Sequence, residues 1–190
     1  LFHPIPIKFG KPIDINIAKE KIGLKSYFKY LLFFGIIRKY KGLDILIKAM
    51  KEIVKQDNKI RLLVVGENYE SAEKYKNLAI KEDVIESIQF RNDFINDNEI
   101  KFWFSSASLI IQPYKSASQS GITPLAIQFE TPTVCSNIKG MSEFVTDCKD
   151  GFLSNPDPDD FANKILFALK FDLDLIKKEL RKKKNQYSWE

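Results

Sequence analysis

Six short apolar runs alternate with segments of helical spacing, and this alternation limits the possible folds more than any other feature of the chain. The clearest runs are "YLLFFGI" at residues 30–36 and "IRLLVVG" at residues 60–66. An uninterrupted apolar run of this length is typical of a strand that is buried on both faces of a parallel sheet. We therefore expect an α/β fold with a Rossmann-like, doubly wound parallel sheet of about six strands.

Shorter runs predict the other strands at residues 87–93, 108–114, 132–137 and 151–155. The predicted helices cover residues 17–23, 43–54, 67–82 (with the loop before it), 96–107, 121–130, 157–169 and 173–185, with a helical turn at 142–147. Pro4, Pro6 and Pro12 predict an extended linker over residues 1–15. The expected organisation is a linker (1–15), a sheet domain (16–172) and a last helix with its tail (173–190).

Charge and cysteine content narrow the class of protein. The net charge of +5 at pH 7 is compatible with an anionic ligand. Cys135 and Cys148 lack CxxC spacing, which predicts a reducing, cytoplasmic compartment without disulfides or a zinc site. The single histidine, His3, argues against a histidine triad or metal cluster. No apolar run reaches the roughly 18 residues of a membrane span, and the start does not resemble a signal peptide. Both ends are interpreted as cuts inside a longer protein.

Ligands of doubly wound sheets bind beyond the carboxyl ends of the strands, which directs attention to residues 35–42, 66–70 and 114–121. In the first loop, Gly35 permits close backbone approach, and Arg38 and Lys41 place positive charge beside a helix N-terminus. Two cations at such a place suit a diphosphate. The loop lacks the ending of a P-loop and the GxGxxG pattern. A solvated basic turn would explain the same residues.

The other two strand exits carry polar residues that also have ordinary structural explanations. Glu67 follows Gly66 and can bond sugar hydroxyls, although Glu67 and Asn68 could equally cap a helix. The third loop is small and uncharged, and its amides and hydroxyls can surround a phosphate or a sugar. Its candidate residues are Ser116, Ser118, Gln119, Ser120 and Gly121. The alternative is an ordinary loop with a serine N-cap.

The C-terminal tail is strongly basic. Its cations are Lys177, Lys178, Arg181, Lys182, Lys183 and Lys184. We expect a solvated helix face, with attraction to the anionic inner face of a membrane as the alternative, which would make the protein a peripheral membrane protein. Nucleic acid is not an expected partner, because no RNA-binding or DNA-binding motif is present.

Four stretches, taken in order, resemble one known family. They are "FFGIIRKYKGLDILIKAM", "RLLVVGEN", "SASLIIQPYKSASQSGITPLAIQFETPTVCSNIKGMSEFV" and "DGFLSNPDPDDFANKI". Together they resemble the C-terminal, donor-binding domain of the family-four retaining GT-B glycosyltransferases, also described as glycosyl transferases group 1. The resemblance covers roughly residues 30–170 and implies one half of a GT-B fold. The opening "HPIP" resembles the linker before that domain, and the closing "YSWE" resembles the start of the helix that crosses back to the absent N-terminal acceptor domain.

The resemblance assigns roles to residues at the strand exits. Lys41 matches the family lysine that contacts the donor diphosphate, Arg38 fits an arginine that assists it, and Gly35 matches the glycine beside the phosphates. Gly66 and Glu67 match a strand exit beside the nucleotide. Further donor-binding positions are Asn92 and Phe94, in the base-contacting segment, and Ser118, Gln119, Ser120 and Gly121 in the loop after the fourth strand.

The chain departs from the family in that loop. The common pattern is Glu, seven residues, Glu; the first acid meets the donor sugar and the second meets the ribose. Counted back from Pro132, these positions fall near Ala117 and Leu125, and a shifted alignment gives Gln119 and Ile127. Neither alignment supplies an acid, which leaves the ribose contact open and makes Gln119 and the loop amides the expected contacts of the sugar.

The resemblance implies transfer of a hexose from a nucleotide diphosphate sugar to a glycan or lipid-linked acceptor, with retention, in bacterial cell-surface polysaccharide synthesis. Arg38, Lys41 and the loop amides would stabilise the leaving diphosphate, so we expect no metal or cofactor. We expect the fragment alone to bind donor weakly and turn nothing over. Two alternatives stay open: a non-catalytic nucleotide-sugar-binding domain, which the missing acids favour, and another Rossmann-type enzyme such as a dehydrogenase, against which the absence of GxGxxG argues.

Overall fold

The six predicted strands all form, and they make one parallel sheet. The structure, a computed structural model, describes residues 5–67, 72–93 and 95–187. The strands are β1 (Lys29–Phe34), β2 (Ile60–Val65), β3 (Ile88–Arg91), β4 (Leu109–Gln112), β5 (Thr133–Ser136) and β6 (Phe152–Ser154). Their order across the sheet is β3-β2-β1-β4-β5-β6, and every neighbouring pair is parallel. The predicted Rossmann-like, doubly wound sheet is confirmed.

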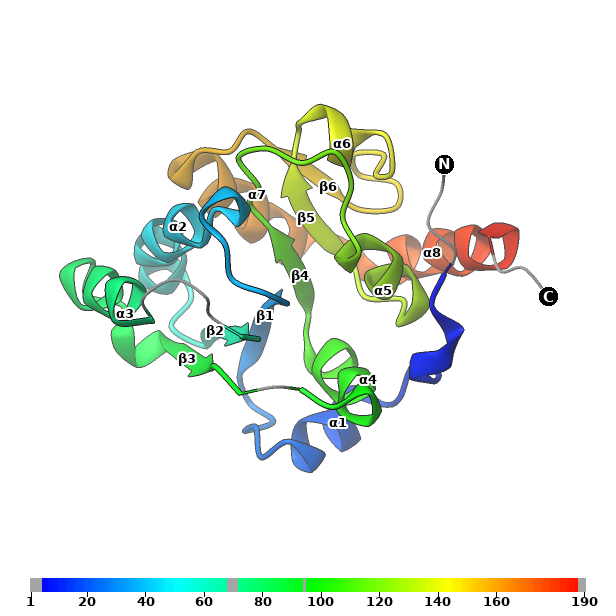
Figure 1. Ribbon diagram of the computed structural model, residues 1–190, viewed down its shortest axis with the longest axis horizontal. Helices are drawn as coiled ribbons and strands as arrows, with labels where there is room; N and C mark the ends of the chain where they lie inside the picture. The colour runs from blue at the N-terminus through cyan, green and yellow to red at the C-terminus, as the bar shows by residue number, and fades with distance from the viewer. Residues whose placement is uncertain (1–4, 68–71, 94, 188–190) are drawn as a thin grey trace.

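Helices cover both faces of this sheet (Figure 1). They are α1 (Ile15–Lys21), α2 (Leu43–Gln56), α3 (Ala72–Lys81), α4 (Asp97–Ser106), α5 (Ile122–Gln128), α6 (Lys139–Ser142), α7 (Pro158–Lys170) and α8 (Leu173–Tyr187). Short 3-10 helices lie at η1 (Ile7–Phe9), η2 (Lys39–Lys41) and η3 (Ile85–Ser87). Helices α2, α3, α7 and α8 contribute to one hydrophobic core, and α4 and α5 contribute to a second.

The packing of strand β1 explains why its residues from Tyr30 onward are apolar. Leu31 and Phe33 pack in the first core, whereas Tyr30 and Leu32 pack in the second. Successive side chains of a strand point to opposite faces of the sheet, so a central strand under two layers of helices has no polar face. The uninterrupted run at residues 30–36 is the consequence.

The N-terminal segment is less extended than predicted. Helix α1 begins at Ile15, two residues earlier than expected, because the carboxylate of Asp14 accepts hydrogen bonds from the backbone N–H groups of Asn16 (2.8 Å) and Ile17 (3.2 Å). A side-chain acceptor at this position satisfies the otherwise unpaired amides of the first turn. Residues 1–4 of the predicted linker lie outside the described residues.

The helical turn predicted at residues 142–147 is wrong. The helix is α6, over Lys139–Ser142, and residues 143–147 contain no helix. A Cβ atom at Gly140 would lie 2.1 Å from the carbonyl oxygen of Ala117, so only glycine lets α6 pack so closely against the loop after β4. Because glycine is a poor helix former, the sequence around Gly140 did not predict this helix.

Helix α8 packs onto the sheet domain through its apolar face, with Ile176 and Leu180 in the first core. The expectation of a solvated basic face is wrong for two of its cations. Lys183 pairs with Asp150 (2.8 Å) and Lys184 pairs with Glu130 (3.4 Å), and both side chains are largely buried. Arg181 also pairs with Glu130 (2.6 Å), but its side chain stays exposed. The proposed boundary at residue 173 stays a prediction. None of the described helices is long and apolar enough to span a lipid bilayer.

Candidate functional site

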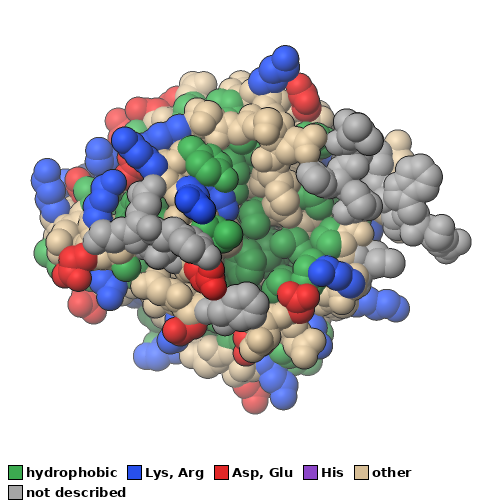
Figure 2. Space-filling model, viewed as in Figure 1, with side chains coloured by type: hydrophobic (Ala, Val, Ile, Leu, Met, Phe, Trp, Pro, Cys, Tyr) green, Lys and Arg blue, Asp and Glu red, His purple; other side chains and the backbone are tan. Residues whose placement is uncertain are grey.

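Two of the predicted loops meet at the centre of the sheet. From β1 the sheet continues through β2 to β3, and from β4 it continues through β5 to β6, so the chain leaves these two neighbours in opposite directions. Doubly wound sheets bind ligands in the crevice at such a reversal. Contacts tie the loops together: the Lys115 N–H donates to the Tyr40 carbonyl (2.7 Å), and Lys115 Nζ pairs with Asp44 (2.7 Å). Figure 2 shows a central hollow with a hydrophobic floor and Lys or Arg side chains beside it.

Gly35 and Gly66 lie against each other where β1 and β2 end. Gly35 has a φ of +96° and Gly66 a φ of +135°, a region that side-chain-bearing residues rarely adopt. A Cβ at Gly66 would lie 2.4 Å from the carbonyl oxygen of Gly35, and a Cβ at Gly35 would lie 3.2 Å from Nζ of Lys41. Gly35 therefore keeps space open beside the Lys41 amine, and Gly66 lets the ends of β1 and β2 approach each other.

Lys41 is the cation that the fold encloses most completely at this site. Its side chain lies under the loops with only 8% of the residue exposed, and its amine lies 5.7 Å from the ring centre of Tyr114. Tyr114 in turn contacts Tyr40 edge to face at 5.9 Å. Burial, and then the charge of Arg38, lower the pKa of Lys41 to about 8. No carboxylate of the described residues lies within ion-pair distance of this amine.

The other predicted site residues on this side are less enclosed than Lys41, or their side chains have no described contact at the site. Arg38 is exposed and lies close enough to Lys41 to influence its pKa. The carbonyl of Glu67 accepts the N–H of Ile37 (2.8 Å), which brings Glu67 to the same crevice. Asn92 is exposed just after β3, with β2 between it and β1. Asn68 and Phe94 lie outside the described residues.

The loop after β4 divides into an exposed part and a buried part. Ser118, Gln119 and Gly121 are exposed, whereas Ser120 is buried. The Ser120 hydroxyl donates to Oε1 of Gln112 (2.7 Å) and accepts the N–H of Ile122 (3.1 Å). The Ser120 side chain therefore holds the turn that leads into α5. The alternative of a serine N-cap is wrong, because the N-cap residue of α5 is Gly121.

Gln112 organises this loop, and the sequence analysis missed it. Its buried amide Nε2 donates to Oγ1 of Thr133 (3.0 Å) and of Thr123 (3.3 Å), while its Oε1 accepts from Ser120. The amide thus joins β4, β5 and α5 at the floor of the site. The available signal was a polar residue at the end of the apolar run "LIIQ", because a buried amide must find hydrogen-bond partners.

The structure also locates the carboxylate nearest to this loop in the sequence. Residues 114–129 contain no acid, and Glu130 lies beyond the end of α5, where Arg181 and Lys184 hold its carboxylate. Leu125 and Ile127, the second positions of the two alignments, are buried apolar side chains. The loop after β4 therefore offers the site amide and hydroxyl groups and no carboxylate. Nowhere in the described ranges do three His, Cys, Asp or Glu side chains group as a metal site.

Solved structures with the same fold include proteins described as glycosyltransferases. The structure of HepE from Anabaena, solved with UDP and glucose, matches with a TM-score of 0.84 and 18% identity, over 99% of this chain and 52% of that one. The C-terminal domain of LpcC from Francisella tularensis matches with a TM-score of 0.77 and 18% identity, over 96% of this chain and 98% of that one. These similarities confirm the predicted GT-B type of Rossmann-like domain.

Sequence comparison identifies the family. D-inositol 3-phosphate glycosyltransferase from Streptomyces bingchenggensis is 27% identical over 187 residues, which cover 93% of this chain and 41% of that protein. The chain thus spans less than half of this relative. The family model described as "Glycosyl transferases group 1" matches residues 14–189. Because that match includes nearly the whole chain, this protein belongs to the glycosyl transferases group 1, as a C-terminal domain of their GT-B fold.

Proposed function

We propose that this chain is the donor-binding half of a glycosyltransferase that moves a hexose from a nucleotide diphosphate sugar to a glycan or lipid-linked acceptor. The supporting observation is the buried Lys41 amine, which lies beside Gly35 at the reversal of the sheet without a carboxylate partner among the described residues. HepE, which shares the fold, was solved with UDP and glucose. We further propose a role in bacterial cell-surface polysaccharide synthesis, with an acceptor site completed outside this chain.

The proposed role of the site is electrostatic. As the bond between the sugar C1 and the diphosphate oxygen breaks, negative charge grows on the leaving diphosphate. The Lys41 amine and the Arg38 guanidinium would stabilise this charge, and positively charged groups held ready in a partly buried site contribute a few kcal/mol each. Gly35 and Gly66 would let the phosphates approach, and Gln119 with the loop amides would face the sugar. Two side-chain cations make a metal unnecessary in this proposal.

The product is expected to retain the anomeric configuration of the donor, as the family resemblance implies. No described residue of this site is an evident nucleophile or base for that reaction. The donor phosphate or the rest of the protein would have to accept the proton of the acceptor hydroxyl. We therefore expect the chain alone to bind donor weakly and to show no turnover.

A non-catalytic nucleotide-sugar-binding domain is the second candidate. The observation in its favour is that residues 114–129 carry no acid, while Glu130 is held by Arg181 and Lys184. Turnover of UDP-, GDP- or ADP-sugars by the longer protein from which this domain derives would exclude it. Donor binding without turnover by the longer protein would favour it over the transferase.

Replacing Lys41 with alanine should weaken binding of UDP or GDP by about tenfold or more, because a charge-assisted contact to phosphate is lost. Titration calorimetry on the 190-residue chain measures this. Lys39→Ala is the matched control, because it removes an exposed positive charge from the same loop. Unchanged affinity in Lys41→Ala, or an equal loss in both variants, would rule out the diphosphate contact.

Donor affinity should also depend on pH. The pKa of Lys41 is lowered to about 8, so its amine loses the proton as the pH rises through that value. UDP affinity should therefore fall between about pH 7 and about pH 9, with the midpoint displaced upward in the complex because the diphosphate stabilises the charged amine. Calorimetry over this range should give a flat profile for Lys41→Ala. The same pH dependence in both proteins would contradict the assignment.

A further inference from the structure

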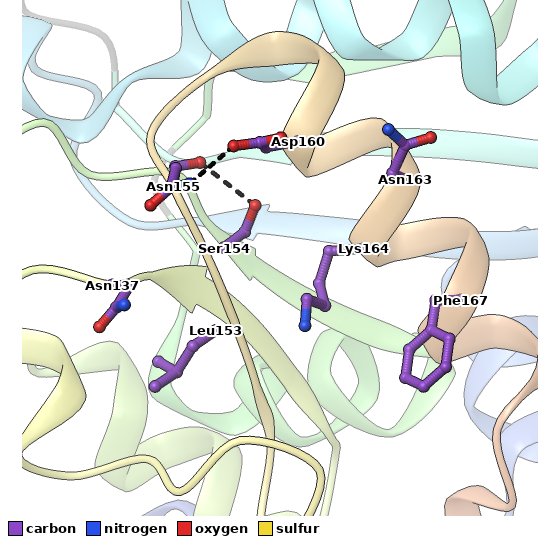
Figure 3. A pocket seen from close by; sticks show the side chains of 8 residues that line it. All are labelled: Asn137, Leu153, Ser154, Asn155, Asp160, Asn163, Lys164 and Phe167. Carbon is purple, nitrogen blue, oxygen red and sulfur yellow. Dashed lines mark hydrogen bonds between the residues drawn. The ribbon is translucent and has the colours of Figure 1, made fainter.

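A second cavity lies at the edge of the sheet, between β6 and α7, and nothing in the proposed donor contacts uses it. Its volume is about 430 Å³, within the usual range of small-molecule pockets. Side chains from the end of β5, from β6 and from α7 surround it (Figure 3). Asn137 directly follows β5 and Asn155 directly follows β6, so this end of the cavity lies at the same edge of the sheet as the Lys41 loop.

Three asparagine side chains line this cavity. In the part of the chain that the structure describes, the side-chain amides of Asn137 and Asn163 have no hydrogen-bond partner. Asn155 Nδ2 donates to Asp160 Oδ2 (2.8 Å), and its amide oxygen remains an acceptor. Each amide offers both donors and an acceptor, which is the capacity needed to bind hydroxyl groups.

The charges around the cavity are already compensated. Lys164 Nζ lies 3.2 Å and 3.4 Å from the two carboxylate oxygens of Asp147. Asp147 also accepts the N–H of Leu153 (2.8 Å), so this pair occupies a backbone donor of the edge strand. With Asp160 as a further carboxylate in the lining, the cavity has no excess of positive charge that would attract a phosphate. A neutral ligand suits it better than a nucleotide.

Phe167 supplies an apolar wall. Its ring contacts those of Phe152 (6.1 Å between ring centres) and Phe171 (5.7 Å), yet 48% of the residue remains exposed. A flat apolar surface beside several amides is complementary to a pyranose ring, which has an apolar C–H face and a rim of hydroxyl groups. Figure 3 shows Phe167, Asn163 and Lys164 projecting from α7 on the side of the cavity opposite Asn137.

We propose that this cavity binds a neutral sugar unit of the glycan acceptor. Identifying the sugar as part of the acceptor rests on the proposed glycosyltransferase function. The cavity also adjoins the donor loop through a short segment: Asn137 is followed at once by Ile138 and α6, and Gly140 of α6 packs against the carbonyl of Ala117. A sugar bound at Asn137 would thus lie three residues along the chain from Gly140, which packs against the loop after β4.

Side-chain amide signals of the isotope-labelled chain test the proposal directly. Maltose, lactose or mannobiose, at millimolar concentration, should shift the signals of Asn137, Asn155 and Asn163. Phe167→Ala should weaken the response about tenfold, which corresponds to about 1.4 kcal/mol. Tyr27→Ala is the matched control, because it removes another exposed ring, 59% exposed, from a different part of the molecule.

Asn163→Ala is a second test in case the Phe167 variant is unstable. The exposed side chain of Asn163 makes no described hydrogen bond, so its removal should not affect folding. It should lower saccharide affinity about fivefold without changing the melting temperature. Absence of shifts with all three disaccharides, or full affinity in both variants, overturns the proposal. UDP in a separate titration should shift signals of the Lys41 loop instead. If the chain binds UDP but no saccharide, the sugar site alone is refuted. If it binds a saccharide but not UDP, the donor assignment alone is refuted.

Discussion

Replacing Gly42 with alanine should lower the melting temperature of the chain by about 10 °C, which corresponds to about 3 kcal/mol for a domain of this size. Gly42 has a φ of +70°, and a Cβ at this residue would lie 1.9 Å from the carbonyl oxygen of Pro113. Because the carbonyl of Pro113 belongs to the backbone, it cannot rotate away as a side chain could, so the loops after β1 and β4 must separate. Thermal unfolding followed by circular dichroism measures the change.

Gly23→Ala is a matched control for this prediction. Gly23 has the same φ of +70°, but a Cβ there would meet no atom within 4 Å. It should therefore cost only the backbone strain, about 1 kcal/mol or about 3 °C. The difference between the two variants isolates the contact with Pro113. Equal losses would show that the loops do not pack as closely as the structure indicates.

Replacing Lys183 with methionine should destabilise the chain by about 3 kcal/mol, because it leaves the carboxylate of Asp150 buried without its partner. The ion pair measures 2.8 Å, and its two side chains are only 15% and 10% exposed. Lys183 also donates to the carbonyl of Phe144, while the Asp150 carboxylate accepts the N–H of Thr146 (2.8 Å). Urea unfolding gives the free energy.

Two variants separate the ion pair from general effects on α8. Lys182→Met removes a neighbouring lysine whose pair with Glu179 is exposed, so it should change stability by about 0.5 kcal/mol or less. The double variant Lys183→Met with Asp150→Asn should recover part of the loss, since no uncompensated charge remains buried. Equal losses in Lys182→Met and Lys183→Met would contradict a special role for the buried pair.

The sheet was the most predictable part of the molecule. Each central strand is covered on both faces, and Tyr30 and Leu32 face one core while Leu31 and Phe33 face the other. The sequence of these strands is therefore apolar at nearly every position, and such a pattern can be recognised without knowing the neighbouring elements. Helix ends were less predictable. Helix α6 contains Gly140, which is explained by close packing against Ala117 and not by local helix propensity.

The candidate site was predictable in its place but not in its construction. Strand exits direct attention to Gly35, Lys41 and Gly66, because parallel strands present their carboxyl ends at one edge. The burial of the Lys41 amine, and the lowering of its pKa that follows, depend on Tyr114 and on loops far away in the sequence. Gln112 was missed for the same reason, since its partners Thr123 and Thr133 come from other elements.

The amino-acid sequence by itself determined the alternation of strands and helices, the parallel sheet and the edge at which the candidate site lies, because these follow from the spacing of apolar residues along the chain. The tertiary structure alone decided which cation of the candidate site is buried, which serine of the loop after β4 is buried, and which tail lysines pair with acids of the sheet domain. Each of these depends on groups such as Asp150 and Lys183 that are distant in sequence. Such groups come within contact distance only when the whole sheet and its helices have packed together.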